Sequence, residues 1–228
     1  MSIIAIDGPA ASGKGTLARR IAAALGYAWL DTGLLYRAAG AEALDRGADP
    51  ADPTAAEKAA HAVAARIRDE GPALLSDPRL RGDPMADAAS KLSAVSAARA
   101  ALLELQRSFA ARPTIDGVPV GGAVLDGRDI GTVICPDADV KLFVTAAVEE
   151  RARRRVKELH ARGQKAIYEA VLEDLKQRDA RDSLRAVAPL KPADGAFLLD
   201  TSALDADQAL AAAMVVIDAA LSRGTPQP

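Results

Sequence analysis

The sequence predicts an α/β fold in which a parallel sheet is flanked by helices. Apolar runs of strand length alternate along the chain with longer stretches of helical period, which is the order expected of such a sheet. The first run, Ser2 to Asp7, leads directly into a glycine-rich turn and then a helix. With 228 residues, half of them hydrophobic, the chain is long enough to bury the core of one domain with mobile appendages.

The next elements follow from hydrophobic spacing and from helix-breaking residues. The first helix stops at Gly26, and Tyr27 to Asp31 forms a short second strand. The apolar face of that helix consists of Leu17, Ile21 and Leu25. From Leu34 to Arg112 the period is helical, so this region is predicted to be an inserted helical subdomain. Its pieces are separated at Pro50, Pro53, Gly71-Pro72, Pro78 and Gly82-Asp83-Pro84.

The second half of the chain returns to sheet-like character after a Pro/Gly-rich loop from Pro113 to Gly122. The predicted strands are Ala123 to Asp126, Val140 to Thr145 and Phe197 to Asp200. Two charged helices between Glu149 and Asp182 meet near Gly163 and form a hairpin that can swing. A last helix, Asp205 to Leu221, packs on the sheet, and Arg223 to Pro228 is expected to be a frayed tail.

Composition excludes several classes of protein. The 29 basic and 31 acidic residues leave a formal net charge of −2, so no overall basic field favours nucleic acid. A single cysteine, Cys135, excludes an internal disulfide framework. The N-terminus lacks a basic leader, and no apolar run reaches the roughly 18 residues of a membrane span. We therefore expect a cytoplasmic protein without nucleic-acid or membrane partners.

A phosphate-binding loop is the first functional motif. It lies between the first predicted strand and the first predicted helix, the context in which this motif is credible. Its backbone amides and helix N-terminus favour phosphate, and its lysine reaches the β and γ oxygens. The hydroxyl that usually follows the lysine comes one residue late, so a metal ion is expected to bind there through water. The loop consists of Gly8, Pro9, Ala10, Ala11, Ser12, Gly13, Lys14, Gly15 and Thr16.

This motif indicates a nucleotide but not a reaction, and a tight strand-to-helix turn without a ligand is the plainer alternative. The Gly-Lys-Gly-Thr variant at residues 13–16 resembles the loop of nucleotide kinases of the adenylate kinase type. A GTPase also needs an Asn-containing motif that reads guanine, and this chain contains no Asn. The GTPase alternative is therefore disfavoured.

Five further segments stand out together with the phosphate-binding loop. They are residues 30–37, residues 88–90 with Arg99, residues 126–132, residues 178–182 and residues 185–190. The most specific strings are Asp-Gly-Arg-Asp at residues 126–129 and Arg-Ala-Val-Ala-Pro-Leu at residues 185–190. In order and approximate spacing, along nearly the whole chain, these segments resemble the bacterial cytidylate kinase family. The resemblance implies a P-loop kinase fold with a helical acceptor-binding insert and a helical-hairpin lid.

The resemblance implies that Ser90, Arg99 and Asp129 read cytosine. The chemistry of the base supports this, because a carboxylate can accept from the exocyclic amine while Arg and Ser donate to the two acceptors. It also implies that Arg37 and Arg128 hold the α-phosphate of the acceptor, with Arg185 close by. The other residues assigned to the acceptor site are Arg178 and Asp182 facing the ribose, Arg181, Thr32 and Tyr36.

The implied reaction transfers the γ-phosphate of ATP to CMP or dCMP, with Mg²⁺ and with Thr16 as the residue nearest the metal. The anionic acceptor needs no general base, so the expected work is electrostatic. The residues assigned to it are Lys14, Arg128, Arg185 and, from the lid, Arg154 and Arg155. We expect a monomer with a core of residues 1–36, 113–148 and 190–228, an acceptor-binding insert of residues 37–112 and a lid of residues 149–182.

Two departures from the family pattern leave questions open. The segment between Arg66 and Met85 is shorter and richer in turns than the family's insert, and the Pro113 to Gly122 loop is longer. The competing interpretations are a P-loop kinase for another small acceptor and a switch module that hydrolyses nucleotide slowly. The three arginines expected at the acceptor phosphate argue against the switch.

Overall fold

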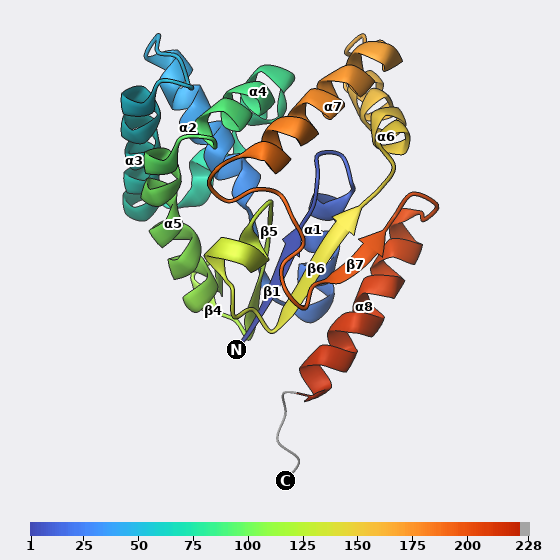
Figure 1. Cartoon of the computed structure of the whole chain (residues 1–228). Helices are drawn as coiled ribbons and strands as arrows, with labels where there is room; N and C mark the ends of the chain where they lie inside the picture. Colours follow the sequence, from blue (N-terminus) through green and yellow to red (C-terminus); the bar gives the residue numbers. More distant parts are fainter. Residues whose placement is uncertain (224–228) are drawn as a thin grey trace. The chain divides into compact units, whose positions relative to one another are not determined.

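The structure is a computed structural model that describes residues 1–223. Its centre is a five-stranded sheet of order β2-β5-β1-β6-β7, in which β5, β1, β6 and β7 pair in parallel (Figure 1). The predicted α/β class is confirmed, and the five predicted strands occur at their expected places. The strands are β1 (Ser2–Asp7), β2 (Ala28–Asp31), β5 (Gly122–Gly127), β6 (Val140–Thr145) and β7 (Phe197–Asp200).

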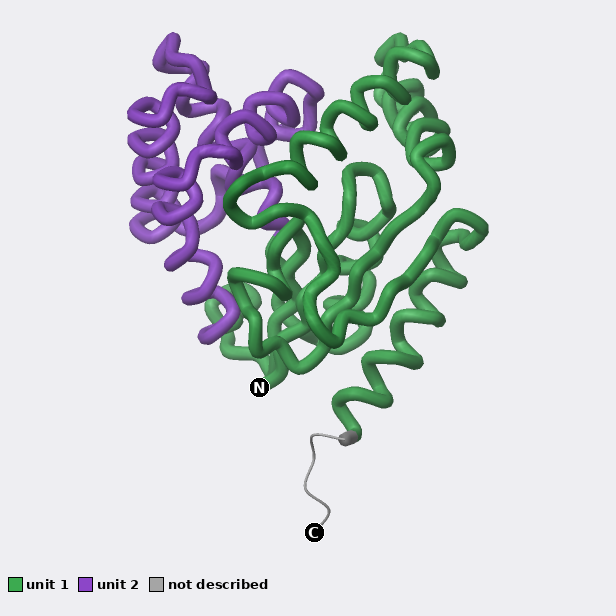
Figure 2. Tube along the Cα trace, viewed as in Figure 1, with its two compact units in different colours: residues 1–30, 113–228 green, residues 31–112 purple. Residues whose placement is uncertain are grey.

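The chain forms two compact units (Figure 2). Residues 1–30 and 113–228 make up the first unit, and residues 31–112 make up the second. The helices of the first unit are α1 (Lys14–Leu25), α6 (Val148–Ala161), α7 (Tyr168–Leu184) and α8 (Ala206–Arg223). The tail was predicted to begin at Arg223, but this residue is the last one of α8; the rest of the predicted tail, residues 224–228, lies outside the described residues.

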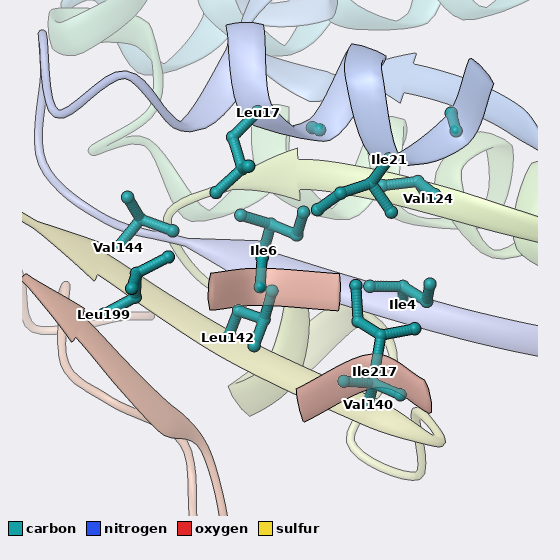
Figure 3. Packing of buried hydrophobic residues seen from close by; sticks show 13 residues of the cluster. Ile4, Ile6, Leu17, Ile21, Val124, Val140, Leu142, Val144, Leu199 and Ile217 are labelled. Atoms are coloured by element: carbon teal, nitrogen blue, oxygen red, sulfur yellow. The ribbon is translucent and has the colours of Figure 1, made fainter. Parts of the chain in front are cut away.

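The core of the first unit lies between the sheet and the pair α1 and α8. Leu17 and Ile21 project from α1 onto Ile6 and Val124, because a spacing of four residues keeps them on one helix face (Figure 3). Ile217 of α8 belongs to the same cluster, and α8 contacts α1 and the strands β6 and β7. The second half of β1 is buried, and β1 pairs with β5 along one edge and with β6 along the other. The position of its carboxyl end is therefore held by both neighbouring strands.

The second unit is helical, as predicted. Its helices are α2 (Thr32–Asp45), α3 (Pro53–Glu70), α4 (Asp83–Leu92) and α5 (Ser96–Ala111). The turn-rich segment contains two 3₁₀ turns, η1 (Pro72–Ser76) and η2 (Pro78–Arg81). At the contact of α2 with α4, a Cβ on Gly40 would lie 2.9 Å from the Cβ of Ala88, so glycine permits this close packing.

The loop prediction for Pro113 to Gly122 was wrong in part. The segment contains an antiparallel hairpin of two short strands, β3 (Thr114–Ile115) and β4 (Val118–Pro119). Asp116 and Gly117 connect them with φ values of 50° and 80°, as a type I′ turn requires. The Asp-Gly pair was the available signal, but two-residue strands are too short for an alternating pattern to reveal.

Candidate active site

The candidate site is built on one edge of the sheet of the first unit. Because β1, β5, β6 and β7 are parallel, the segments that follow them emerge at the same edge. The phosphate-binding loop follows β1, Arg128 and Asp129 follow β5, α6 follows β6, and Thr201 follows β7.

Within the described residues no helix is both long and apolar enough to cross a membrane.

The phosphate-binding loop has the backbone that its sequence predicts. A Cβ on Gly8 would lie 2.0 Å from the carbonyl oxygen of Val144, so only glycine lets the loop approach β6. Gly13 stands at the N-terminus of α1 with φ 87°. No described side chain caps α1 and its first turn holds no acidic residue, so its amides face a position suited to an anion. The Nζ of Lys14 donates to the carbonyl oxygen of Pro9 at 3.4 Å, which keeps the ammonium over the loop.

Arg154 of α6 lies beside this loop. Its Nη1 and Nη2 donate to the hydroxyl and carbonyl oxygens of Thr201 at 3.0 and 2.5 Å. The Thr201 hydroxyl is in turn 3.1 Å from the carbonyl oxygen of Ser12. A Cβ on Gly13 would lie 3.9 Å from Nη1 of Arg154. A guanidinium group therefore stands next to the turn that is suited to phosphate.

Asp126, a residue near the end of β5, has its carboxylate close to the start of α1. Its Oδ1 accepts a hydrogen bond from the indole nitrogen of Trp29 at 2.8 Å. Its Oδ2 would lie 3.5 Å from a Cβ on Gly15, the residue directly after Lys14. Since Asp126 is buried, the indole orients a carboxylate toward the start of α1.

Arg151 ties the predicted lid to the phosphate-binding loop. Its guanidinium donates to both carboxylate oxygens of Asp179 in α7, at 3.1 and 2.6 Å, and to the carbonyl oxygen of Ala10 at 3.2 Å. The methyl groups of Ala10 and Ala11 pack against Ala152 and apolar residues of α7. The ion pair joins α6 to α7 at the base of their hairpin, and a hydrogen bond and apolar contacts join this base to the loop.

Asp182, near the end of α7, interacts electrostatically with three arginines. The Nε of Arg128 donates to its Oδ2 at 2.8 Å, and the Nε of Arg185 donates to its carbonyl oxygen at 3.3 Å. Burial acts to raise the pKa of the Asp182 carboxyl, but Arg128, Arg178 and Arg185 together hold that pKa below its ordinary value. The carboxylate therefore stays ionised and keeps guanidinium groups from three sequence positions at one place.

Asp7 connects the phosphate-binding loop to the segment that carries Asp129. Its two carboxylate oxygens accept hydrogen bonds from the amides of Ile130 and Gly131, each at 2.8 Å. Burial raises the pKa of Asp7 to about 6, and the negative charge of Asp129 acts in the same direction. Asp129 precedes the helical turn of residues 130–134 but its side chain does not cap that turn. The amides of Ile130 and Gly131 in this turn are instead bound by the carboxylate of Asp7.

In the second unit, Arg99 and Ser90, which were predicted to read cytosine, lie in one cluster with Tyr36, which was predicted to line the acceptor pocket. The guanidinium of Arg99 lies 5.5 Å from the ring centroid of Tyr36, a cation–π distance, and its Nη1 donates to the carbonyl oxygen of Ser93 at 3.4 Å. The Ser93 hydroxyl donates to the carbonyl oxygen of Ser90 at 3.0 Å. The Ser90 hydroxyl is buried without a hydrogen-bond partner among the described residues, which suits a group reserved for a ligand.

Comparison with known proteins identifies the family. A family profile described as cytidylate kinase matches residues 4–219. The chain belongs to the cytidylate kinase family. The cytidylate kinase of Paramagnetospirillum magneticum is 59% identical over 217 residues, which cover 95% of this chain and 97% of that protein. Those of Methylocella silvestris and Rhodospirillum rubrum are 57% and 55% identical, over 96% and 94% of this chain and 94% and 96% of theirs.

Other residues that the cytidylate kinase resemblance singled out have different surroundings. Arg37 donates to the carbonyl oxygens of Leu80 and Gly82, at 2.7 and 3.1 Å, and so braces the 3₁₀ segment. Arg155 pairs with Glu158 of its own helix at 2.8 Å, and Arg181 is exposed. Thr32 is buried in the first turn of α2. Their roles toward a substrate stay predictions.

Four residues of this cytidylate kinase were missed by sequence reasoning, which assigned no role to Asp7, Asp126, Arg151 or Thr201. Asp7 and Asp126 do carry a signal, because each is an acidic residue at the carboxyl end of an apolar strand. Arg151 belongs to a basic stretch, residues 151–155, from which the sequence analysis selected Arg154 and Arg155 instead. Thr201 carried no signal, since its contact with Ser12 spans 189 positions.

Proposed function

We propose that this protein transfers the γ-phosphate of ATP to CMP and dCMP, giving ADP with CDP or dCDP. The observation that carries the proposal is the pairing of two features at one sheet edge in a member of the cytidylate kinase family. The phosphate-binding loop supplies amides and Lys14 for a donor, and the cluster around Asp182 supplies arginines for an acceptor phosphate.

The chemistry asks the protein for charge neutralisation rather than for a base. A nucleoside monophosphate has a second phosphate pKa of about 6, so the attacking oxygen is already anionic at neutral pH. Lys14 and the α1 amides would hold the donor phosphates, while Arg128 and Arg185 would hold the acceptor phosphate. Arg154, which lies beside Gly13, is the lid residue best placed to add positive charge on the donor side.

Cytosine would be read by Asp129, Arg99 and Ser90. The unpartnered hydroxyl of Ser90 supports this assignment. A site built from such groups rejects bases that leave them unpaired, so UMP should be a poor acceptor.

The residues present fit a Mg²⁺ ion that accompanies the donor phosphates. The described residues contain no group of three or more His, Cys, Asp or Glu that could hold a metal alone. Asp126 instead offers one oriented carboxylate oxygen beside Gly15, and Thr16 offers a hydroxyl one residue later. These two would hold the ion together with phosphate oxygens and water. When bound, Mg²⁺ would supply neutralisation of phosphate charge.

The remaining assignments belong to the same proposal. Residues 37–112 would serve as the acceptor-binding insert and residues 149–182 as the lid, and the enzyme would act as a cytoplasmic monomer without nucleic-acid or membrane partners. The net charge of −2 supports the last point.

An acceptor panel tests the proposal. ADP release is measured with ATP, Mg²⁺ and each of CMP, dCMP, UMP and AMP, and we expect CMP and dCMP to be used far better than UMP and AMP. Equal use of AMP, or ADP release that no monophosphate stimulates, would contradict it.

A further inference from the structure

Asp7 stands between the donor side and the acceptor side of the candidate site. The next residue, Gly8, opens the phosphate-binding loop, and the two carboxylate oxygens accept from the main-chain amides of two consecutive residues. Those amides belong to Ile130 and Gly131, directly after Arg128 and Asp129. One rigid side chain from the central strand therefore sets where this second segment lies relative to the first.

Stability alone does not favour an acid at this position. Asp7 is 3% exposed, and burial opposes its ionised form. Asp129 adds repulsion, while Lys14 and the two amides oppose that effect only in part. A neutral side chain would avoid the cost of burying a charge. Only a carboxylate, however, presents two equivalent acceptors to two parallel N–H groups.

We infer that Asp7 is a positioning residue for the acceptor base. By accepting hydrogen bonds from the amides of Ile130 and Gly131, Asp7 fixes the Asp129 carboxylate at the place where this carboxylate accepts a hydrogen bond from the cytosine amine. This inference rests on the proposed function. It adds a residue that touches no substrate and acts through Asp129. It also explains how β1 can serve both substrates, because the strand that begins the donor loop also orients the acceptor loop.

The substitution Asp7→Asn tests this role with almost no change in shape. The amide retains one acceptor oxygen, but its NH₂ group faces one of the two N–H groups, so the segment must shift. We expect kcat/KM for CMP to fall about ten- to a hundredfold. The Kd of ATP should change less than about twofold, and the ratio of kcat/KM for CMP to that for UMP should fall about tenfold.

Asp139→Asn is the matched control. Asp139 also accepts a main-chain N–H of β1, that of Ile3 at 2.7 Å, but at the opposite end of the strand. The same chemical change there should leave the CMP to UMP ratio unaltered. If Asp7→Asn fails to fold, the smaller Asp7→Ser, which keeps one acceptor, replaces it in the same measurements.

A double-mutant cycle with Asp129→Ala decides between positioning and a general structural role. If Asp7 acts through Asp129, adding Asp7→Asn to Asp129→Ala should have little further effect on CMP use. An undiminished effect, or an equal loss for CMP and UMP, would overturn the inference. Failure of the proposed function looks different, because the unaltered enzyme would then show no preference for CMP to begin with.

Discussion

Lys14 is the first residue of α1, the helix that follows the phosphate-binding loop. Its ammonium lies over the loop through the Pro9 carbonyl, in a position to reach donor phosphate oxygens. We expect Lys14→Ala to lower kcat by about a thousandfold or more, because the charge on the transferring phosphoryl group loses its closest side-chain partner. Turnover with CMP and ATP measures this.

Lys58→Ala is a suitable control, since Lys58 is an exposed lysine of α3. Both variants should unfold at nearly the same temperature as the unaltered enzyme, because neither side chain is buried. Near-normal turnover of Lys14→Ala would remove the loop from the donor site.

A site residue could be predicted from the sequence when its contacts lie close to it along the chain. The loop from Gly8 to Thr16 was predictable because its glycines, lysine and following helix define the backbone within nine residues. Asp7 was not, because its partner Gly131 lies 124 positions away and only the pairing of β1 with β5 brings them together. Arg151 likewise became distinct from its neighbours only through Asp179.

At the scale of elements, the α6–α7 hairpin depends on one buried ion pair. The side chains of Arg151 and Asp179 are 5% and 26% exposed, and Arg151 also binds the Ala10 carbonyl. We expect Arg151→Met to lower the free energy of unfolding by about 2–4 kcal/mol, since it leaves Asp179 and the Ala10 carbonyl without this donor. The KM for ATP should rise more than the KM for CMP, because the segment that loses its contact with Arg151 is the phosphate-binding loop, which is proposed to hold ATP. Urea unfolding and initial rates measure these effects.

Arg153→Met gives the comparison on the same helix. The Arg153 side chain is 64% exposed, and within the described residues its ion pair is with Glu150, so its loss should cost less than about 0.5 kcal/mol. Equal effects of the two variants would mean that the lid is not fastened through Arg151.

Elements differed in how well the sequence revealed them. Helix α1 and strands β1 and β6 were predicted because apolar spacing and a glycine stop act within each segment. The β3–β4 hairpin was missed, since its exposed two-residue strands bury no face from which a period could be read. The 3₁₀ turns of residues 72–81 match the predicted richness in turns, and Arg37 explains why they are ordered.

At the scale of the whole molecule, the order of strands brings the functional segments together. The alternation of strands and helices predicted a parallel sheet, but it did not predict that β5 would lie beside β1, with Ser2 opposite Gly122. That neighbour relation places Asp126, Arg128 and Asp129 at the edge where the phosphate-binding loop begins. Helical periodicity alone indicated the extent of the second unit, residues 31–112, but the return of residues 113–228 to the first unit depends on strand pairing such as that of β5 with β1.

The buried charge of Asp7 should also appear in the pH dependence of global stability. Its pKa is about 6 in the folded protein against an ordinary value of 3.8, so the folded state favours the protonated form. The contribution of Asp7 to the free energy of unfolding is fully present below pH 3.8 and is lost as the pH rises through 6. The loss amounts to about 3 kcal/mol.

Asp7→Asn removes this pH-dependent contribution and leaves the other titrating groups in place. Asp182, whose pKa lies below its ordinary value, contributes with the opposite sign but does so equally in both proteins, so it cancels in the comparison. The stability of the unaltered enzyme relative to Asp7→Asn should therefore fall between pH 4 and pH 7 by about 3 kcal/mol. Urea unfolding of both proteins across this range measures the difference. A difference that stays constant with pH would mean that Asp7 is as easily ionised in the folded protein as in the unfolded chain. Ionisation of the buried carboxylate would then not lower the free energy of unfolding.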